Sequence, residues 1–408
     1  MSHVLIIGRN FTPFASYLTD NGHTYTLLLH KNTTNKTVKQ RDNTVVVDFL
    51  DEKLIDKALT QLPHKPDAVM TIYENYILPA AKIASSLNLP GLPIDAAEAC
   101  TDKYLMRGLF ATSPQKISPA FSIVNNAEDL KSFANTHEFP LILKPTNLAK
   151  SLLVTKNHTI DELLSNYEKS MSLLHGVYKK YAPTRNPQLL VEEFLEGTIH
   201  SVDAFVDSHG VPEVLSQIVD YQTGYDIGFD DNFHYSRILP SRLSDHDQVL
   251  LRECAKAGIR ALGMKNSPAH VEIIMTPSGP RIVEIGARNG GYRERMHRLA
   301  NNLDIPGAAL QLALGNKPTI TATKNDSCAV LELFPKKPGT FKEITNENAL
   351  HTLPSTVYVS IKAKPGQHVG KAADGHKMCA VIILNNSDKQ QFDKDLAYIN
   401  DSVHVSVG

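Results

Sequence analysis

The chain has 408 residues, of which 42% are hydrophobic and 21% are charged, so roughly two or three globular domains are expected. Its formal net charge of -1 gives no electrostatic basis for binding nucleic acid or an acidic membrane surface, and neither is expected as a partner. No apolar run approaches a membrane span, and the first residues show no basic segment followed by a long apolar one. The four cysteines lack disulfide or metal spacing, so reduced thiols and a cytoplasmic location are expected.

The first part of the chain, residues 3 to about 95, alternates short apolar strands with helical segments. Strands are expected at residues 4–7, 25–29, 45–47 and 68–70. This alternation is typical of a parallel sheet covered by helices. The first strand ends at Gly8 without the further glycines of the dinucleotide fingerprint, so no nicotinamide or flavin site is expected there.

Glu74 begins a helical pattern at the carboxyl end of the fourth strand. Ligands bind at this edge of open α/β sheets, so Glu74 is a candidate substrate contact. An acid in the first turn of a helix is also favourable by itself, and that alternative stays open. A linker at residues 89–93 then leads to a helix over residues 101–107, with Thr101 as its expected cap.

The rest of the chain continues with mixed strands and helices. Strands are expected at residues 141–144, 189–194, 201–206, 328–334, 357–363 and 378–384, and helices near 160–174 and 245–262. The segments after Gly315 carry no motif to which chemistry can be attached.

Residues 220–241 are expected to form a polar loop rich in aromatic side chains, among them Tyr221. Aromatic walls with nearby acids would suit an amino-bearing substrate, which makes Tyr221 a candidate substrate contact. A self-packed surface loop would have the same composition, so both interpretations stay open.

Two glutamates lie on a predicted β-hairpin whose turn falls at residues 276–280. Glu272 and Glu284 are equidistant from Ser278, so they are expected to face each other across the ladder. Opposed residues have Cβ atoms about 5 Å apart, and two opposed carboxylates repel unless a cation lies between them. A hairpin with its polar face in water would also carry glutamates, so the pair alone does not decide between a cation site and a solvated face.

The same register divides the hairpin into a charged face and an apolar face. The glutamate face is expected to carry His270, Ile274, Ile282, Gly286 and Arg288. The apolar face is expected to carry Val271, Ile273, Met275, Val283, Ile285 and Ala287.

Five segments together resemble the ATP-grasp superfamily, and within it the carboxylate–amine ligases and the biotin-carboxylase-like enzymes. They are residues 101–107, 140–145, 191–197, 270–272 and 283–291. The resemblance implies an α/β (mixed α+β) class and an ATP-grasp fold.

The same resemblance implies three domains. Residues 1–97 would form an N-terminal Rossmann-like pre-ATP-grasp lobe, and residues 98–315 the ATP-grasp domain, with a lid subdomain at about 120–195. Residues 316–408 would form a C-terminal mixed α+β lobe.

The resemblance also assigns a nucleotide site. Lys103 and Lys144 match the two phosphate-binding lysines of the family, which neutralise ATP while leaving its γ-phosphate open to attack. Glu192, Glu193 and Leu195 match the segment that lies along adenine, with Glu192 as the side-chain contact.

His200 lies where related enzymes contact ribose or phosphate, although a lone histidine is often structural. The loop after Lys144 lacks the glycines that usually cover the phosphates. Either Lys150, Ser151 and Asn147 replace backbone amides as phosphate donors, or the loop has lost nucleotide-binding geometry.

Glu272 and Glu284 match the two carboxylates that hold Mg²⁺ (or Mn²⁺), an ion that prefers oxygen ligands and bridges the β- and γ-phosphates. Arg288 matches the family's arginine beside the reaction centre, which would stabilise the transferring phosphoryl group. Gly286 stands where many members have a third ligand, an asparagine, so water or Asn289 would have to replace it.

The basic segment after the second glutamate is a further candidate site. The backbone at Gly290 could approach a substrate anion, with Arg293 near its carboxylate. An exposed helix start with ordinary surface arginines is the alternative, and it is preferred for Arg295 and Arg298.

The function implied by the resemblance is an ADP-forming ligase that joins a small-molecule carboxylate to an amine, most like the L-amino-acid ligases that make dipeptides. In such enzymes ATP converts the carboxylate to an acyl phosphate, and the amine displaces phosphate. A purine-biosynthetic ligase or carboxylase and a non-catalytic ATP-binding module stay open as alternatives. The identity of the substrates and the formation of a homodimer are left open as well.

Overall fold

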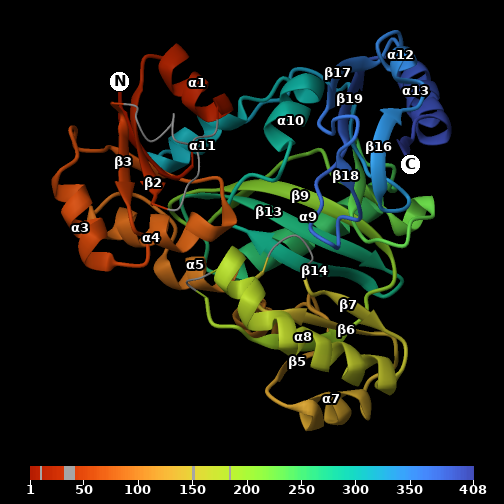
Figure 1. Cartoon of the computed structure of the whole chain (residues 1–408). Helices are drawn as coiled ribbons and strands as arrows, with labels where there is room; N and C mark the ends of the chain where they lie inside the picture. Colours follow the sequence, from red (N-terminus) through yellow and green to blue (C-terminus); the bar gives the residue numbers. More distant parts are fainter. Residues whose placement is uncertain (10–11, 32–41, 149–151, 183–184) are drawn as a thin grey trace.

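The structure is a computed structural model that describes residues 1–9, 12–31, 42–148, 152–182 and 185–408. The mixed α/β class expected from the sequence is confirmed: an N-terminal sheet, a large central sheet and a smaller lid sheet are all covered by helices (Figure 1). Within these ranges, no helix combines the length and the apolar character needed to span a membrane.

The N-terminal sheet is parallel throughout, as expected, with the strand order β3-β2-β1-β4. Its strands are β1 (His3–Gly8), β2 (Thr24–His30), β3 (Thr44–Val47) and β4 (Ala68–Met70). Its covering helices are α1 (Thr12–Asp20), α3 (Glu52–Thr60), α4 (Ile77–Ser86) and α11 (Ile305–Ala313). Alternate residues of β1 face opposite sides: Leu5 and Ile7 pack with α4, and Val4 and Ile6 with α11.

Three short helical elements lie between this sheet and the site. The 3₁₀ helix η1 (Glu74–Tyr76) follows β4, and the helices α5 (Ile94–Cys100) and α6 (Lys103–Ala111) come later. The expectation that Thr101 is the N-terminal cap of α6 is wrong, because Thr101 is the C-terminal cap of α5. The Asp102 side chain caps α6 instead, accepting the backbone N–H groups of Tyr104 and Leu105 at 2.9 and 3.2 Å.

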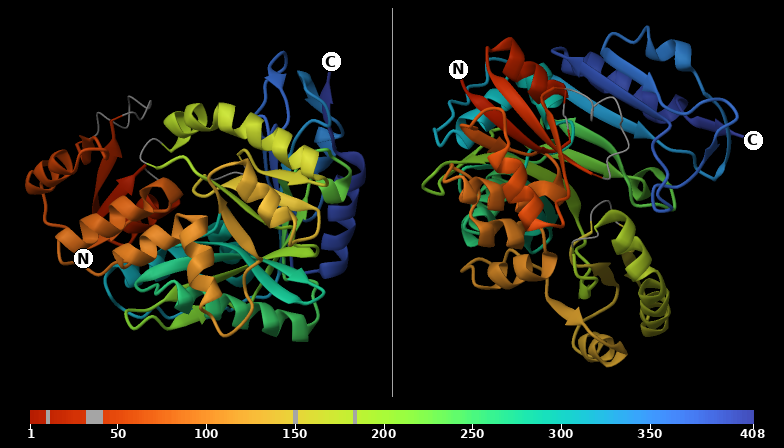
Figure 2. Two further views of the ribbon diagram at one scale, coloured as in Figure 1. Left: turned by 90° about the horizontal axis from the view of Figure 1, so that it is seen from below. Right: turned by 60° about the vertical axis from the view of Figure 1, so that its left-hand side comes forward.

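A separate antiparallel sheet with the order β5-β8-β6-β7 lies in the segment that the resemblance assigns to a lid subdomain, and we use that name for this sheet and its helices. Its strands are β5 (Phe121–Val124), β6 (Leu141–Pro145), β7 (Thr155–Asn157) and β8 (Leu189–Glu193), and its helices are α7 (Ala127–Ala134) and α8 (Ile160–Tyr181). The lid subdomain projects away from the rest of the chain in Figure 1 and in the right-hand view of Figure 2. Lys144 and Glu192 lie diagonally across β6 and β8, since Ile142 pairs with Glu192 and Lys144 with Leu190.

The central sheet follows the order β14-β13-β9-β11-β12-β15-β19-β17, with β10 added beside β9. Its strands up to the hairpin are β9 (Thr198–Val206), β10 (Pro212–Val214), β11 (Val219–Thr223), β12 (His234–Leu239), β13 (Ser267–Thr276) and β14 (Gly279–Gly286). Strands β15 (Ser327–Leu333), β17 (Thr356–Ile361) and β19 (Ala380–Asn386) extend the same sheet from the C-terminal lobe. Strand β12 pairs with β15, so the strands before and after residue 315 are hydrogen-bonded into one sheet.

The expectation of a loop over residues 220–241 is wrong. Strands β11 and β12 pair antiparallel there, joined by the 3₁₀ helix η2 (Tyr225–Ile227). Aromatic side chains favour strands as readily as binding loops, and a register shift at Gln222/Thr223 obscured the alternation.

The remaining elements complete the C-terminal half. They are α9 (Asp245–Ala261), α10 (Arg293–Asn301), β16 (Gly339–Ile344), α12 (Glu347–Leu350), β18 (His368–Val369), α13 (Lys389–Ser402) and β20 (Val405–Val407). A small sheet of order β18-β16-β20 and helix α13 pack against β15 and β19 through one apolar cluster.

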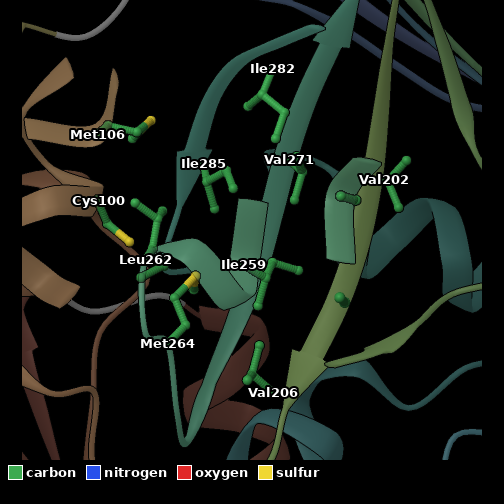
Figure 3. Packing of buried hydrophobic residues seen from close by; sticks show 14 of the residues in the cluster. Cys100, Met106, Val202, Val206, Ile259, Leu262, Met264, Val271, Ile282 and Ile285 are labelled. Atoms are coloured by element: carbon green, nitrogen blue, oxygen red, sulfur yellow. The ribbon is translucent and has the colours of Figure 1, made fainter. Parts of the chain in front are cut away.

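The glutamate hairpin rests on a large apolar core. Val271, Ile282 and Ile285 face helix α9 and the α5–α6 region, as Figure 3 shows. Gly258 of α9 permits this close packing, because a Cβ there would lie 2.3 Å from the Cδ1 of Ile282. The core fixes the hairpin from one side and leaves its other face available for polar groups.

The hairpin register differs from the expected one at two places that compensate. The turn is tighter, because Thr276 pairs with Gly279, and a β-bulge beyond Glu272 shifts the ladder back by one residue. The expected place of Ile282 on the glutamate face is therefore wrong: Ile282 pairs with Ile273 and joins the core. Val283 is the residue that the bulge leaves without a ladder partner.

Candidate functional site

Glu272 and Glu284 are directly paired across β13 and β14, as the sequence predicts. Their side chains are 15% and 36% exposed, so both carboxylates reach the surface of the site. Burial alone would raise the pKa of Glu272, but the neighbouring His270 and His234 bring that pKa below its ordinary value. The Glu272 carboxylate is thus held ionised, which is the state that can bind a cation.

Lys103 is a cation that lies against Glu284. Its Nζ is 2.9 Å from Glu284 Oε2 and donates to the carbonyl of Leu148 at 3.3 Å. Lys103 begins helix α6, and its backbone N–H donates to Thr146 at 2.7 Å, so the helix start is tied to the loop after β6. Burial opposes the charge on Lys103, but Glu284 raises the pKa of its ammonium, and Lys103 lowers the pKa of Glu284 in return.

Lys144, Glu192 and Arg107 form a buried ion cluster between the lid subdomain and the central sheet. Lys144 is bonded to Glu192 Oε1, and the Arg107 Nε donates to Glu192 Oε2 at 3.2 Å. The Arg107 Nη2 also donates to the carbonyl of Val283, the bulge residue next to Glu284, at 2.8 Å. Arg107 thereby connects helix α6, strand β8 and the glutamate hairpin.

Replacing Arg107 with methionine is expected to lower the free energy of unfolding by about 3 kcal/mol, because removing one partner leaves a buried carboxylate short of counter-charge. Calorimetric melting would measure the loss as a lower melting temperature. Arg242→Met is the matched control, since Arg242 forms an exposed ion pair with Asp393 and is expected to cost about 1 kcal/mol or less. Equal melting temperatures for both variants would contradict the role given to Arg107.

Arg288 lies just beyond the hairpin and pairs with Glu74 of η1. Its Nε donates to Glu74 Oε2 at 2.7 Å and its Nη1 to the carbonyl of Asn289 at 3.1 Å. Burial works against the charge, but Glu74 and Glu284 raise the pKa of Arg288, which stays cationic. Gly286 leaves the space for this pair, because a Cβ there would lie 3.3 Å from Glu74 Oε2.

The other predicted nucleotide-binding residues that the structure describes lie at the end of β8, just after it, or on β9. The Glu193 carboxylate accepts the backbone N–H of Ala120 at 2.8 Å, and Leu195 is half-buried in the segment after β8. His200 is buried, with its ring nitrogens 2.7 Å from Thr198 Oγ1 and from Asp220 Oδ1. Lys150 and Ser151 lie outside the described residues.

Three predicted substrate residues lie within the protein rather than on the open site. Arg293 is 1% exposed, and its guanidinium donates to Asp203, Ser201 and Tyr221. Tyr221 is 8% exposed, and Gly290 packs on His270. The Arg293 and Tyr221 side chains are bonded to other protein groups, and the direct role of all three residues in substrate binding stays a prediction.

Several residues of the site were given no role from the sequence. Arg107 has partners 85 and 176 residues away, a separation that no local pattern indicates. Asp203 could have been recognised from the sequence, because it is an acid within an apolar strand. A carboxylate buried in this way needs a charged or hydrogen-bonding partner. His270 was placed on the glutamate face without a function.

The donor set fits a magnesium ion that shares its ligands with a nucleotide. Mg²⁺ is typically held by one or two carboxylates together with phosphates and water, and the hairpin supplies two opposed carboxylates. In the part of the chain that the structure describes, no three His, Cys, Asp or Glu side chains converge to hold a metal by themselves. The arrangement therefore suits an ion that arrives with phosphates.

Three family models match the chain. They describe an ATP-grasp N-terminal domain at residues 20–91, an ATP-grasp domain at residues 137–294 and an L-amino acid ligase C-terminal domain 2 at residues 332–408. Alanine–anticapsin ligase of Bacillus subtilis (strain 168) is 29% identical over 235 residues, which cover 55% of this chain and 49% of that protein. The matches span 49% to 61% of the length of the first curated relatives.

Two solved structures superpose on the whole of this chain. The L-amino acid ligase from Bacillus licheniformis superposes with a TM-score of 0.80 at 18% identity, covering 100% of this chain and 99% of that one. Phosphoribosylglycinamide synthetase from Anaerococcus prevotii gives a TM-score of 0.71 at 19% identity, covering 100% of both chains. At these identities the likeness concerns the fold, and the predicted ATP-grasp fold is confirmed.

Proposed function

We propose that this chain, which belongs to the ATP-grasp superfamily, is an ADP-forming ligase that joins the carboxylate of one amino acid, or of an amino-acid-like molecule, to the amine of another. The observation that carries the proposal is the set of charges around the hairpin. The two opposed glutamates supply a pair of metal ligands. Lys103, which lies between the glutamates and the lid subdomain, and Arg288, which lies beyond them, supply cations for the phosphates. The match to the L-amino acid ligase C-terminal domain favours amino-acid substrates.

Lys103 and Lys144 would bind the phosphates of ATP by exchanging partners. In the structure, Lys103 pairs with Glu284 and Lys144 with Glu192. Phosphate oxygens would replace these carboxylates, and Glu284 would then be free to bind the metal. Partner exchange keeps every charge compensated in both states, which a buried ion requires.

Mg²⁺, held by Glu272 and Glu284, would neutralise charge on the β- and γ-phosphates. Arg288 lies beside Glu284 and would stabilise the negative charge on the transferring phosphoryl group. The substrate carboxylate would take the γ-phosphoryl group and release ADP. The amine would then attack the acyl carbon, losing a proton as phosphate leaves.

A phosphate-release screen over pairs of free amino acids and simple carboxylates, with ATP and Mg²⁺, tests the proposal. At least one pair is expected to give ADP, phosphate and an amide in equal amounts. Turnover with a ribonucleotide amine and not with amino acids would favour the purine-biosynthetic alternative. ATP binding without turnover on any acceptor would favour a non-catalytic nucleotide-binding module.

The affinity for ATP is expected to fall as the pH rises through about 8. Burial lowers the pKa of Lys144 to about 8, so its charge is present below that pH and is lost above it. Phosphate would raise the pKa of the bound lysine, so the free protein must take up a proton to bind, and affinity falls by up to about 10-fold per pH unit. Calorimetric titration between pH 7 and 9.5 measures this.

Lys144→Arg is the control for this pH dependence, because an arginine keeps its charge throughout the range. Its affinity for ATP is expected to be independent of pH above 8, whatever its absolute value. A flat profile for the unmodified protein, or an equal fall in the variant, would contradict the role of Lys144.

A further inference from the structure

Five side chains form a closed ring of polar contacts on the protein side of Glu272. Arg293 Nη2 donates to the Tyr221 hydroxyl at 2.6 Å, and this hydroxyl donates to Glu272 Oε1 at 3.4 Å. His270 Nε2 lies 3.5 Å from the same oxygen. The His270 Nδ1 is 2.8 Å from Asp203 Oδ1, and Arg293 Nε donates to Asp203 Oδ2 at 3.1 Å, which closes the ring.

Four of the five side chains in the ring come from four different elements, and these four are almost completely buried. Asp203 comes from β9, Tyr221 from β11, His270 from β13 and Arg293 from α10. Their exposed fractions are 6%, 8%, 6% and 1%, against 15% for the Glu272 side chain. Glu272 is therefore the member of the ring that meets the site.

The direction of each hydrogen bond follows from the chemistry of the groups. An arginine can only donate, so the Tyr221 oxygen accepts from Arg293, and its own hydrogen can go to Glu272 Oε1 or to His270 Nε2, each 3.4 Å away. Asp203 accepts from both Arg293 and His270, which orients the imidazole with Nε2 toward Glu272. Among the described residues, the contacts to the Glu272 carboxylate are made at Oε1, and Oε2 is left for a ligand in the site.

Gly290 provides independent support for the importance of this arrangement. A Cβ at residue 290 would lie 2.4 Å from His270 Nδ1 and 2.7 Å from Arg293 Cγ. The φ angle of Gly290 is not in the left-handed region, so its absent side chain matters for space and not for backbone conformation. The segment after the hairpin thus makes room for the two basic members of the ring.

We propose that Tyr221, His270, Asp203 and Arg293 are positioning residues that hold Glu272 Oε1, so that Oε2 is fixed for the metal that accompanies ATP. This inference rests on the proposed function, because it concerns the metal side of the same site. Groups that orient a metal-ligating carboxylate typically change metal affinity by 10- to 100-fold when removed. The ring thereby explains why Arg293 and Tyr221, predicted as substrate contacts, are buried.

The test compares the affinity for ATP in Mn²⁺ with the affinity in EDTA, by calorimetry on the full chain. For the unmodified protein Mn²⁺ is expected to tighten ATP binding. Tyr221→Phe removes one hydroxyl and is expected to reduce this Mn²⁺-dependent gain about 10-fold while leaving the affinity in EDTA unchanged. Tyr225→Phe is the matched control, since Tyr225 is 54% exposed on η2, and it is expected to keep the full gain.

Asp203→Asn gives a second test that keeps the shape of the side chain. It is expected to reduce the gain as Tyr221→Phe does, with a melting curve that establishes folding for both. A full Mn²⁺-dependent gain in either folded variant, or an equal loss of affinity in EDTA, would overturn the positioning role. A missing gain in the unmodified protein would instead count against the proposed metal site, so the two failures are distinguishable.

Discussion

Replacing Glu284 with glutamine is expected to lower kcat/KM by about 1,000-fold, a loss of about 4 kcal/mol of transition-state stabilisation. Glu284 is half of the opposed carboxylate pair, and an amide oxygen carries no net charge to hold a divalent cation. The affinity for ATP without metal is expected not to weaken, because Lys103 loses its carboxylate partner and becomes free for phosphate. Steady-state phosphate release and calorimetric ATP binding in EDTA measure the two effects separately.

The control for this substitution is Glu253→Gln, which changes an exposed glutamate paired with Lys256 on helix α9. It is expected to leave both measurements unchanged. Retained activity in Glu284→Gln would remove the basis for the metal assignment. A parallel loss of activity and of metal-free ATP binding would indicate a general disturbance of the site.

Arg288→Lys is expected to lower kcat by about 100-fold while changing the affinity for ATP little. The Arg288 guanidinium is fixed by Glu74 at 2.7 Å and by the carbonyl of Asn289, so its planar fork is already oriented. A lysine keeps the charge but is a flexible point charge that cannot reproduce this geometry. Single-turnover measurements of ADP formation would report the chemical step directly.

Arg298→Lys is the matched control, since Arg298 is 56% exposed and pairs with Glu294 on the surface of helix α10. It is expected to retain the unmodified rate. A kcat for Arg288→Lys within about threefold of the unmodified value would exclude a transition-state role for the guanidinium.

The opposed glutamates show what a local pattern can predict. Alternation along a short strand predicts that Glu272 pairs with Glu284, and this pairing is confirmed. The pairing is kept, although the turn is tighter than expected, because a bulge offsets the difference. The expected place of Ile282 is wrong because the bulge at Val283 changes the face of the β14 residues between it and the turn. The tight turn shifts the register by one residue, and the bulge shifts it back. Alternation along the sequence reveals neither change, because the glutamates stay paired.

The contacts of Glu192 and Arg293 show what such a pattern cannot predict. The resemblance predicts that Glu192 contacts adenine, and in the structure its carboxylate is bonded to Lys144 and Arg107. Arg293 was expected near a substrate, and its partners lie on β9 and β11, up to 92 residues away. Such partnerships depend on the strand order of the central sheet, which brings β9 between β13 and β11.

The central claim, that ATP activates a carboxylate for attack by an amine, is tested most directly by following a carboxylate oxygen. The amino acid that supplies the carboxylate, in the pair that the phosphate-release screen selects, would be labelled with ¹⁸O in both carboxylate oxygens. Each amide bond formed is expected to transfer a labelled oxygen to inorganic phosphate, because the bridging oxygen leaves with phosphate when the amine attacks. Unlabelled phosphate, or label in AMP, would contradict an acyl-phosphate ligase.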